Sequence, residues 1–412
     1  MPRPISAISV RLKVDVAGLE VSLSMPATAT TQFAFYLFRG NQRVAQTEYG
    51  PRPSTRFAIP NIPGWYRAVA FVKNRATGAI ERISGAPRRF PESGEYDPDQ
   101  WRVPVHEAPT TATLRAVDGL HRFLGEGTTS LDFLLQDFER LAHAPAVLVC
   151  FNGAISKRQE KIGPFFAGTG IARRLGLPVI CVADPTVTRA RDIALAWYAG
   201  CDDHPHLSRT IGRHLSEVSA QMKRPLVLMG GSGGAFAALS VVRHVEGPAA
   251  VVACNPQTAI HRYYRQSVIR YFERAFPSIA RSFRLEAPEQ QTPEQLRDAL
   301  ATAGVFEELA DTADSGKFRS IILQNAHDSH HVNRHLKPLM TAVGAEWSGS
   351  NSAHCGDEFG SWLGRWGEGH VAPPASILEP VVLKVVANES VRSIISGLEA
   401  NHGIASPGAN WT

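Results

Sequence analysis

The stretch PLVLMGGSGGAFAALS at residues 225–240 decides the fold, because it joins an apolar segment to a helix through a glycine-rich turn. The run at 225–229 is typical of a strand buried on both faces, and AFAALS is typical of a buried helix. Glycines flank Ser232 in the pattern G-x-S-x-G. Such a sharp turn requires glycines, because larger side chains there would strike the strand and the helix. We therefore predict an α/β sheet with Ser232 at the end of a middle strand.

Fully apolar runs recur along the second part of the chain. Longer amphipathic segments separate them, and they lie at 146–151, 177–183, 249–254, 320–324 and, more weakly, 345–347. Strands that are apolar at every position are covered on both faces, which predicts a parallel sheet wrapped by helices. Helical spacing of apolar residues from about residue 130 to Leu141 predicts a helix before the first of these strands.

The first 90 residues show a different pattern. Apolar and polar residues alternate over short runs at 8–16, 19–23, 33–38, 43–49, 56–59 and 65–72. Short alternating strands separated by turn residues are typical of an antiparallel sandwich. We therefore expect an immunoglobulin-like domain at about 1–90, a linker rich in Pro and acidic residues at 91–129, and an α/β domain at 130–412.

Composition narrows the classes of function. The chain has 412 residues, 44% of them hydrophobic, and 43 Lys and Arg against 38 Asp and Glu give a net charge of only +5. This excess does not suggest the dense basic surface typical of nucleic-acid binding. Five widely spaced cysteines argue against a disulfide framework and a structural zinc site. Because no apolar run is long enough to span a membrane and charges interrupt the N-terminus, we expect a cytoplasmic protein.

The turn at Ser232 has a competing interpretation as a phosphate-binding loop. However, residues 230–234 lack the Lys-Ser/Thr ending of a P-loop and the acidic partner of a GxGxxG motif. With G-x-S-x-G on a middle strand, residues 130–412 resemble the α/β-hydrolase superfamily. The resemblance implies a nucleophilic serine, then a carboxylate after a later strand, then a histidine near the C-terminus, and no cofactor.

Asp328 is the candidate for the carboxylate. It follows the run at 320–324, whereas the loop 255–257 after the preceding run, Asn-Pro-Gln, offers no carboxylate. At the end of a strand, a carboxylate can orient the histidine ring and stabilise its charged form. Capping the following helix is an alternative role, and the two can coexist. Asp184 also ends a strand but precedes Ser232, so we interpret it as a cap or a substrate-pocket residue.

Two histidines compete for the role of general base. His354 follows the last weak strand, while His370 lies on the glycine-rich loop WGEGHVAPP at 366–374, just before an apolar helix. A Gly-His turn before the final helix resembles the histidine loop of the superfamily more closely, so His370 is preferred and His354 is the alternative. Either one must come within about 2.6–3.2 Å of Ser232 to act as base.

The resemblance implies an oxyanion hole made of two backbone N–H groups. One belongs to Gly233, directly after the serine, and the other to Ala154. Ala154 ends a loop in which Asn152 replaces the histidine of the superfamily's His-Gly-X turn, and an ordinary Asn-Gly turn is the alternative. Asn152 and Gly231 are expected to border the substrate beside these donors.

Further substrate contacts are expected from an insertion and from aromatic residues. Residues 255–319 exceed the length of one crossover helix, which predicts a lid at about 258–315 with Arg and Tyr at helical spacing. The lid would contact a sugar or an anionic substrate, or it would be an amphipathic helix with its aromatic residues packed inward. Trp197 and Tyr198 would likewise stack on carbohydrate or pack in the core.

A group of histidines after the run at 320–324 suggests metal binding as another chemistry. It comprises His327, Asp328, His330, His331 and His335, of which two stand one helical turn apart. A metal-dependent hydrolase is therefore a further hypothesis. Because the serine motif already accounts for the aspartate, we expect no metal.

These motifs together predict a serine hydrolase or acyltransferase that forms an acyl-enzyme on Ser232. A sandwich ahead of a hydrolase-like domain, with FNGA at 151–154 and DPT at 184–186, is similar to proteins of capsule and surface-polysaccharide clusters, including carbohydrate O-acetyltransferases. That resemblance implies an O-acyl carbohydrate as the ester substrate. A non-catalytic glycan- or partner-binding protein with a degenerate hydrolase domain is the alternative.

Overall fold

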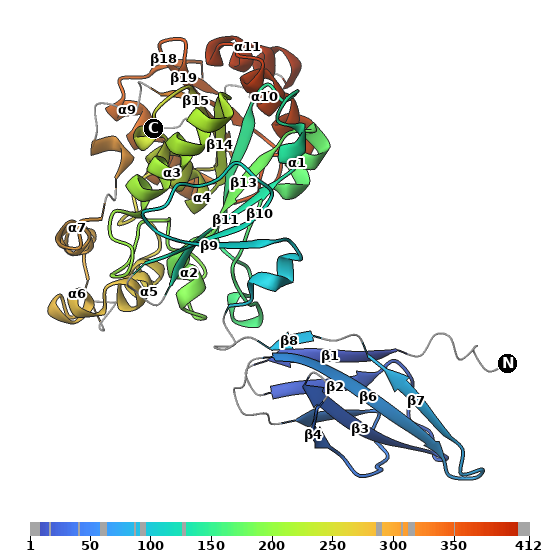
Figure 1. Ribbon diagram of the computed structural model, residues 1–412. Coiled ribbons are helices and arrows are strands. Elements are labelled where there is room, and N and C mark those ends of the chain that lie inside the picture. Colours follow the sequence, from blue (N-terminus) through green and yellow to red (C-terminus); the bar gives the residue numbers. More distant parts are fainter. Residues whose placement is uncertain are drawn as a thin grey trace. The chain divides into compact units, whose positions relative to one another are not determined.

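The computed structural model divides the chain into two compact units (Figure 1). The first comprises Met1–Gln100 with Glu160–Gly163, and the second Trp101–Gln159 with Pro164–Thr412. The structure describes residues 9–15, 18–39, 42–57, 64–85, 88–90, 96–125, 129–285, 291–305, 308–311, 318–349 and 351–402. None of the helices in these ranges combines the length and the apolar character that a membrane span requires.

Two antiparallel sheets build the first unit. One sheet contains, in order, β1 Val10–Asp15, β2 Gly18–Leu23 and β5 Ser54–Phe57. The other contains β4 Gln42–Gln46, β3 Thr31–Arg39, β6 Gly64–Asn74 and β7 Ile80–Ser84, and β8 Arg88–Phe90 also pairs with β6. Both sheets contribute buried side chains, such as Val21 and Phe35, to one core. The expected antiparallel sandwich is present, and its immunoglobulin-like identity stays a prediction.

A mostly parallel sheet organises the second unit, with eleven strands among the described residues. In order across the sheet they are β17 Glu346–Ser348, β18 Ser352–Cys355, β19 Phe359–Gly364, β16 Arg319–Asn325, β15 Ala249–Cys254, β14 Leu226–Gly231, β12 Val147–Phe151, β13 Val179–Val182, β11 Ser130–Gln136, β10 Gly119–Leu124 and β9 Val105–Pro109. From β13 to β19 through β12, β14, β15 and β16, every neighbouring pair is parallel. The predicted apolar strands therefore form the parallel centre of this sheet.

The margin of the sheet formed by β9, β10 and β11 differs from the expectation. The predicted linker 91–129 contributes β9 and β10, and the helix predicted from about residue 130 is the strand β11. Strand β11 pairs antiparallel with both β10 and β13. The helix prediction was wrong because β11 is buried on both faces from Ser130 to Leu135. Such a strand shows no alternation, and its apolar residues can also fit helical spacing.

Helices cover both faces of the sheet (Figure 1). The main ones on one face are α3 Leu207–Met222 and α4 Gly233–Val241, and those on the other are α1 Thr169–Leu175, α10 Ala375–Val386 and α11 Val391–His402. Successive strand residues alternate between the two cores, so that Leu228 packs in the first and Val227 in the second. This arrangement explains why the strands are apolar at every position.

The parallel strands bring distant loops together at one edge of the sheet. The carboxyl ends of β12, β14, β15, β16 and β19 all lie at this edge, because these strands run in the same direction. The loop after β15 carries α5 Arg265–Ala275, α6 Pro277–Ser282 and α7 Pro293–Thr302, inside the predicted lid. The loop after β16 leads into α8 Ser329–His331, a π-helix at Val332–Leu336 and α9 Lys337–Ala342. This unit has the α/β-hydrolase fold.

Candidate active site

Ser232 occupies a strained turn between β14 and α4. Its φ of 57° and ψ of −119° lie in a region that side chains disfavour. Two glycines make the turn possible: a Cβ on Gly230 would collide with the backbone of Gly234, and a Cβ on Gly234 would lie 2.5 Å from the Phe151 carbonyl oxygen. The turn therefore has the geometry that G-x-S-x-G predicts, with the serine only half-buried at the edge of the sheet.

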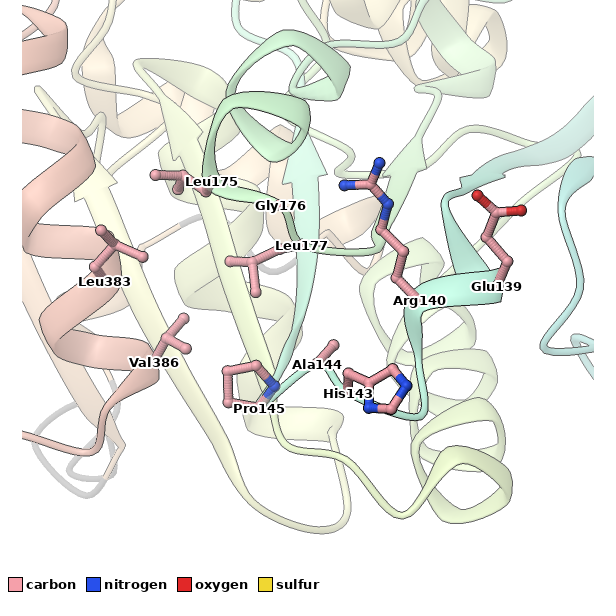
Figure 2. Close-up of a pocket in the computed structure, with 10 residues that line it drawn as sticks. All are labelled: Glu139, Arg140, His143, Ala144, Pro145, Leu175, Gly176, Leu177, Leu383 and Val386. Carbon is pink, nitrogen blue, oxygen red and sulfur yellow. The ribbon is translucent and has the colours of Figure 1, made fainter.

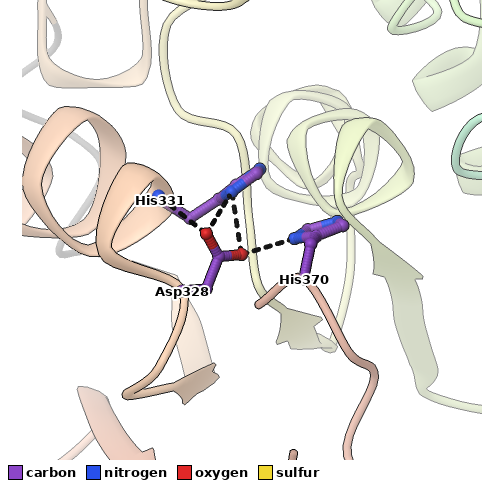
Figure 3. Close-up of side chains that lie close together, drawn as sticks. All are labelled: Asp328, His331 and His370. Atoms are coloured by element: carbon purple, nitrogen blue, oxygen red, sulfur yellow. Dashed lines mark hydrogen bonds and ion pairs between the residues drawn. The ribbon is translucent and has the colours of Figure 1, made fainter. Parts of the chain in front are cut away.

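Asp328 accepts hydrogen bonds from two imidazoles (Figure 3). His370 Nδ1 lies 2.5 Å from Asp328 Oδ2, and His331 Nδ1 lies 3.0 Å from Oδ1. Asp328 also caps α8, because Oδ1 accepts the backbone N–H of His331 at 3.2 Å. Burial alone would raise the pKa of Asp328, but the hydrogen bonds from His331 and His370 outweigh it and hold the pKa below its usual value. Asp328 is therefore ionised at neutral pH.

The charge of Asp328 determines the tautomer of His370. An ionised carboxylate can only accept, so His370 donates from Nδ1, which leaves the lone pair on Nε2 in the neutral form of the ring. The side chain of His370 is 42% exposed, whereas that of Asp328 is only 5% exposed. In the neutral ring, Nε2 of His370 is thus the nitrogen that can accept a proton, and the buried Asp328 carboxylate stabilises the charge that the ring then gains.

Two buried asparagines hold the loop that carries His370. Asn325, at the end of β16, donates from Nδ2 to the Gly369 carbonyl at 2.7 Å. Asn255, after β15, donates from Nδ2 to the Val371 carbonyl at 2.7 Å. The two asparagines are themselves linked, since the Asn325 N–H donates to Asn255 Oδ1 at 2.7 Å. The sheet edge therefore positions the glycine-rich loop on both sides of the histidine.

Gln257 is the partner of the serine hydroxyl in this structure. Gln257 Nε2 donates to Ser232 Oγ at 2.8 Å, while no hydrogen bond joins Ser232 to His370 within the described ranges. Sequence reasoning passed over Gln257 because the loop after β15 held no carboxylate. Its position directly after a central strand was the available signal.

The loop Asn152-Gly153-Ala154 runs beside the serine turn. A Cβ on Gly153 would lie 2.9 Å from the Gly231 carbonyl oxygen and 3.8 Å from Ser232 Cβ. Asn152 is buried and holds this loop, because its N–H donates to the Tyr198 hydroxyl at 2.9 Å. Among the described residues, the N–H groups of Gly233 and Ala154 have no hydrogen-bond acceptor.

Three residues for which substrate contact was one expectation are buried in the structure. Trp197 and Tyr198 are 0% and 2% exposed, so they offer no surface for stacking on a sugar. Asp184 is also buried and caps α2 Pro185–Arg189, accepting the N–H of Thr186 at 2.9 Å and that of Tyr198 at 2.8 Å. Burial raises the pKa of Asp184 to about 6, against the effect of these hydrogen bonds. The helix cap and the core packing given as alternatives in the sequence analysis are present, and substrate contact by these residues stays a prediction.

His354, the alternative base, lies far along the sheet from Asp328. It sits in β18 opposite Gly360, and Gly360 is in turn opposite Ile321 of β16. Strand β16 continues to Asn325 before Asp328 is reached, so His354 lies toward the other edge of the sheet. The hairpin of β18 and β19 was not anticipated, and it carries this histidine away from the site. His354 is therefore not placed to act as base.

The residues that could hold a metal in the structure differ from the histidine group considered in the alternative metal-site hypothesis. Asp328, His331 and His370 each place one ligand atom within 4.8 Å of the others. The rings of His331 and His370 stack at 4.1 Å with a 20° angle between their planes. Their Nδ1 atoms therefore point side by side toward Asp328 rather than toward a common point, which fits shared hydrogen bonding better than a tetrahedral ion.

The remaining histidines of that group also contact other parts of the chain. His327 Nδ1 is 3.1 Å from the Gly367 carbonyl oxygen, and His335 Nδ1 accepts the N–H of Thr258 at 3.2 Å. His330 stacks on Tyr264 with ring centroids 4.8 Å apart. The rings of His330, His331 and His335 also contact one another, with centroids 5.2–5.6 Å apart, so these three histidines pack together while each has a further partner.

A cavity of about 500 Å³ lies away from this site (Figure 2). Pro145, which precedes β12, and Leu177, which precedes β13, line it together with Leu383 of α10. It therefore opens at the amino ends of the parallel strands, whereas Ser232 lies at their carboxyl ends. Its lining is mostly apolar.

No family model matches this chain, and no curated protein matches its sequence. Solved structures with a similar fold include an S-formylglutathione hydrolase from Agrobacterium tumefaciens, at 15% identity and a TM-score of 0.40 over 66% of this chain and 94% of that one. A puromycin hydrolase has 15% identity and a TM-score of 0.41, over 78% of this chain and 45% of that one. An acetyl xylan esterase from Paenibacillus sp. R4 has 14% identity and a TM-score of 0.39, over 65% of this chain and 82% of that one. The chain spans about half the length of the puromycin hydrolase.

Proposed function

We propose that this chain is a serine-dependent ester hydrolase or acyltransferase. Ser232 is the nucleophile, His370 the general base, and Asp328 the carboxylate that orients the base. The observation that carries the proposal is the 2.5 Å contact between His370 Nδ1 and Asp328 Oδ2 at the sheet edge where the strained serine turn also lies. The order serine, aspartate, histidine along the chain is that of α/β-hydrolases.

The reaction proceeds through an acyl-enzyme. Ser232 Oγ attacks the ester carbonyl carbon while His370 Nε2 takes its proton, and the resulting imidazolium is stabilised by Asp328. His370 then gives the proton to the departing alcohol. Water or an acceptor hydroxyl attacks the acyl group in the same way, with His370 again as base, and restores the serine.

The oxyanion of each tetrahedral intermediate binds the N–H groups of Gly233 and Ala154 in this proposal. Both lack an acceptor among the described residues, and the loop of Ala154 runs beside the serine turn. A donor of this kind contributes about 2.7–4 kcal/mol of transition-state stabilisation. In this structure Oγ accepts from Gln257 and is not hydrogen-bonded to His370, and in this proposal the Ser232–His370 hydrogen bond forms as substrate binds.

An O-acyl carbohydrate is the narrower substrate proposal, and it rests on the resemblance to polysaccharide-cluster proteins. Two arginines of the lid give little support to an anionic substrate, because they are already engaged in ion pairs. Arg262 pairs with Glu308 at 2.7 Å, and Arg274 pairs with Asp192 at 2.7 Å. The ester group itself is therefore the part of the substrate on which the proposal relies.

Replacement of the nucleophile tests this function. Wild-type protein is expected to hydrolyse p-nitrophenyl acetate and to be labelled by a fluorophosphonate at Ser232, and Ser232→Ala should abolish both. Persistence of both signals in the pure variant would disprove the proposal. Adding an acceptor sugar and measuring its acylation by mass spectrometry distinguishes transfer from hydrolysis.

The alternatives have different signatures in the same assays. A non-catalytic binding protein predicts that the wild type is not labelled at all, and the missing Ser232–His370 hydrogen bond is the observation in its favour. A metal-dependent hydrolase predicts activity that is lost on exhaustive chelation and restored by zinc. The serine mechanism predicts activity that survives chelation.

A further inference from the structure

We infer that Gln257 is a further catalytic residue, whose amide holds the Ser232 hydroxyl and stabilises negative charge on Oγ during attack. The inference rests on the proposed function, because it requires Ser232 to be the nucleophile. Gln257 is fully buried in the loop after β15, and its Nε2 lies 2.8 Å from Oγ. It thus touches the reacting atom from the interior of the protein.

Trp197 determines which end of the Gln257 amide faces the serine. The indole N–H can only donate, and it donates to Gln257 Oε1. The amide oxygen is therefore turned toward Trp197, and the NH₂ group, which only donates, is turned toward Ser232. Trp197 is 0% exposed and packs edge-on against Tyr271 with ring centroids 5.7 Å apart. The core thus selects the orientation of the amide.

The backbone couples the loop of Gln257 to the serine turn. The Gln257 N–H donates to the Ser232 carbonyl at 3.3 Å, and the Ser232 N–H donates to the Cys254 carbonyl at 2.9 Å. These bonds and the side-chain bond link the two segments at three points. The position of the amide relative to Oγ is therefore set by the same contacts that set the turn.

The neighbouring Tyr263 stays neutral and does not oppose charge on Oγ. Burial raises its pKa, and a hydrogen bond with Gln257 acts in the opposite, weaker direction. The amide thus donates to the uncharged hydroxyl of Ser232 and accepts from the indole of Trp197. The amide oxygen thus has a donor and the amide nitrogen has an acceptor.

This arrangement has a direct chemical consequence. Because Oγ accepts from Gln257, the Ser232 proton is free to be donated to His370 Nε2. As that proton leaves and the bond from Oγ to the carbonyl carbon forms, the partial negative charge on Oγ strengthens the hydrogen bond from the amide. Gln257 keeps both of its amide protons throughout.

The direct test is Gln257→Met, which keeps the length of the side chain and removes the donor. We expect kcat/KM for p-nitrophenyl acetate and the rate of fluorophosphonate labelling to fall about 10- to 100-fold, the effect of one hydrogen bond to a developing charge. KM should change little, because the amide contacts the nucleophile. Gln291→Met is the matched control, since Gln291 is also buried and donates to the Arg284 carbonyl at 3.1 Å; its labelling rate should stay within about twofold of wild type.

Two more variants separate catalysis from packing. Gln257→Glu keeps the shape but turns an acceptor toward Ser232, so it should lose more activity than Gln257→Met. Trp197→Phe should lose activity only by freeing the amide to turn, which makes Trp197 a positioning residue. The loss of activity caused by Trp197→Phe should therefore disappear when Gln257→Met is already present. If the two residues acted independently, the two losses would add.

The outcomes distinguish this inference from the proposed function. If wild type is labelled at Ser232 and soluble Gln257→Met is labelled equally fast, the role of Gln257 is refuted and the serine mechanism stands. If wild type is not labelled, both are refuted. Should Gln257→Met fail to fold, Gln257→Glu decides, because equal activity to wild type in that variant would also refute the inference.

Discussion

His370 Nδ1 lies 2.5 Å from Asp328 Oδ2, although the two residues are 42 positions apart in the chain. They meet because β16 and β19 are neighbouring parallel strands, and each residue follows the carboxyl end of its strand. The carboxylate is buried and the imidazole is half-exposed, so the pair presents a basic nitrogen to ligands.

Asp328→Asn should lower kcat about 1,000- to 10,000-fold with the fold intact. The new amide would donate to His370 Nδ1, which places the imidazole proton on Nε2 and prevents it from accepting the serine proton. Steady-state kinetics with p-nitrophenyl acetate measure this, and circular dichroism checks the fold. A loss of less than tenfold would contradict the role of Asp328.

His331→Phe should lower kcat/KM about 5- to 30-fold, because it keeps a ring stacked on His370 but removes a hydrogen bond to ionised Asp328. The remaining activity should still be abolished by Ser232→Ala. If His331 were a metal ligand, added zinc would change the kcat/KM of the variant and of wild type differently. Kinetics with and without a chelator would reveal this.

Gly234→Ala should destabilise the second unit by about 1–3 kcal/mol and lower kcat/KM more than tenfold. The added Cβ would lie 2.5 Å from the Phe151 carbonyl oxygen and 2.7 Å from that of Asn152, so the loop bearing the oxyanion donors must move. Gly170→Ala in α1 is the control, because its Cβ would have a neighbour only at 3.6 Å. Urea unfolding should show no loss of stability in the control.

The buried His214 should make the protein less stable in mild acid. Burial, with Arg213 adding to it, lowers the pKa of His214 from 6.5 to about 3. Below pH 6.5 the unfolded chain therefore binds a proton that the folded chain does not, and the free energy of unfolding falls as pH decreases toward 3. Between pH 7.5 and 5.0 this one group costs about 2 kcal/mol.

His214→Phe isolates that contribution. The new ring can pack where His214 now contacts Phe123, with ring centroids 4.2 Å apart. Urea unfolding at the two pH values should show a loss of stability in acid that is smaller by about 2 kcal/mol than in wild type. An unchanged dependence on pH would show that His214 is not neutral in the folded state.

Predictions succeeded where a short segment carries its own signal. The run at 225–229 and the glycines around Ser232 predicted strand, turn and helix correctly, because apolar burial and glycine sterics act among neighbouring residues. The strand at Ser130–Gln136 was mistaken for a helix, since only the tertiary structure pairs it with β10 and β13 and packs Phe133 into one core and Leu134 into the other.

The sequence by itself determined that a nucleophile-like serine stands on a turn in an α/β unit, with an aspartate and a histidine on later loops. Only the tertiary structure paired His370 rather than His354 with Asp328, buried Trp197 and Tyr198, and placed Gln257 against Ser232. The reason is physical: a hydrogen bond depends on distances of about 3 Å between groups. Which distant loops come that close depends on the order and the ends of the strands in the sheet.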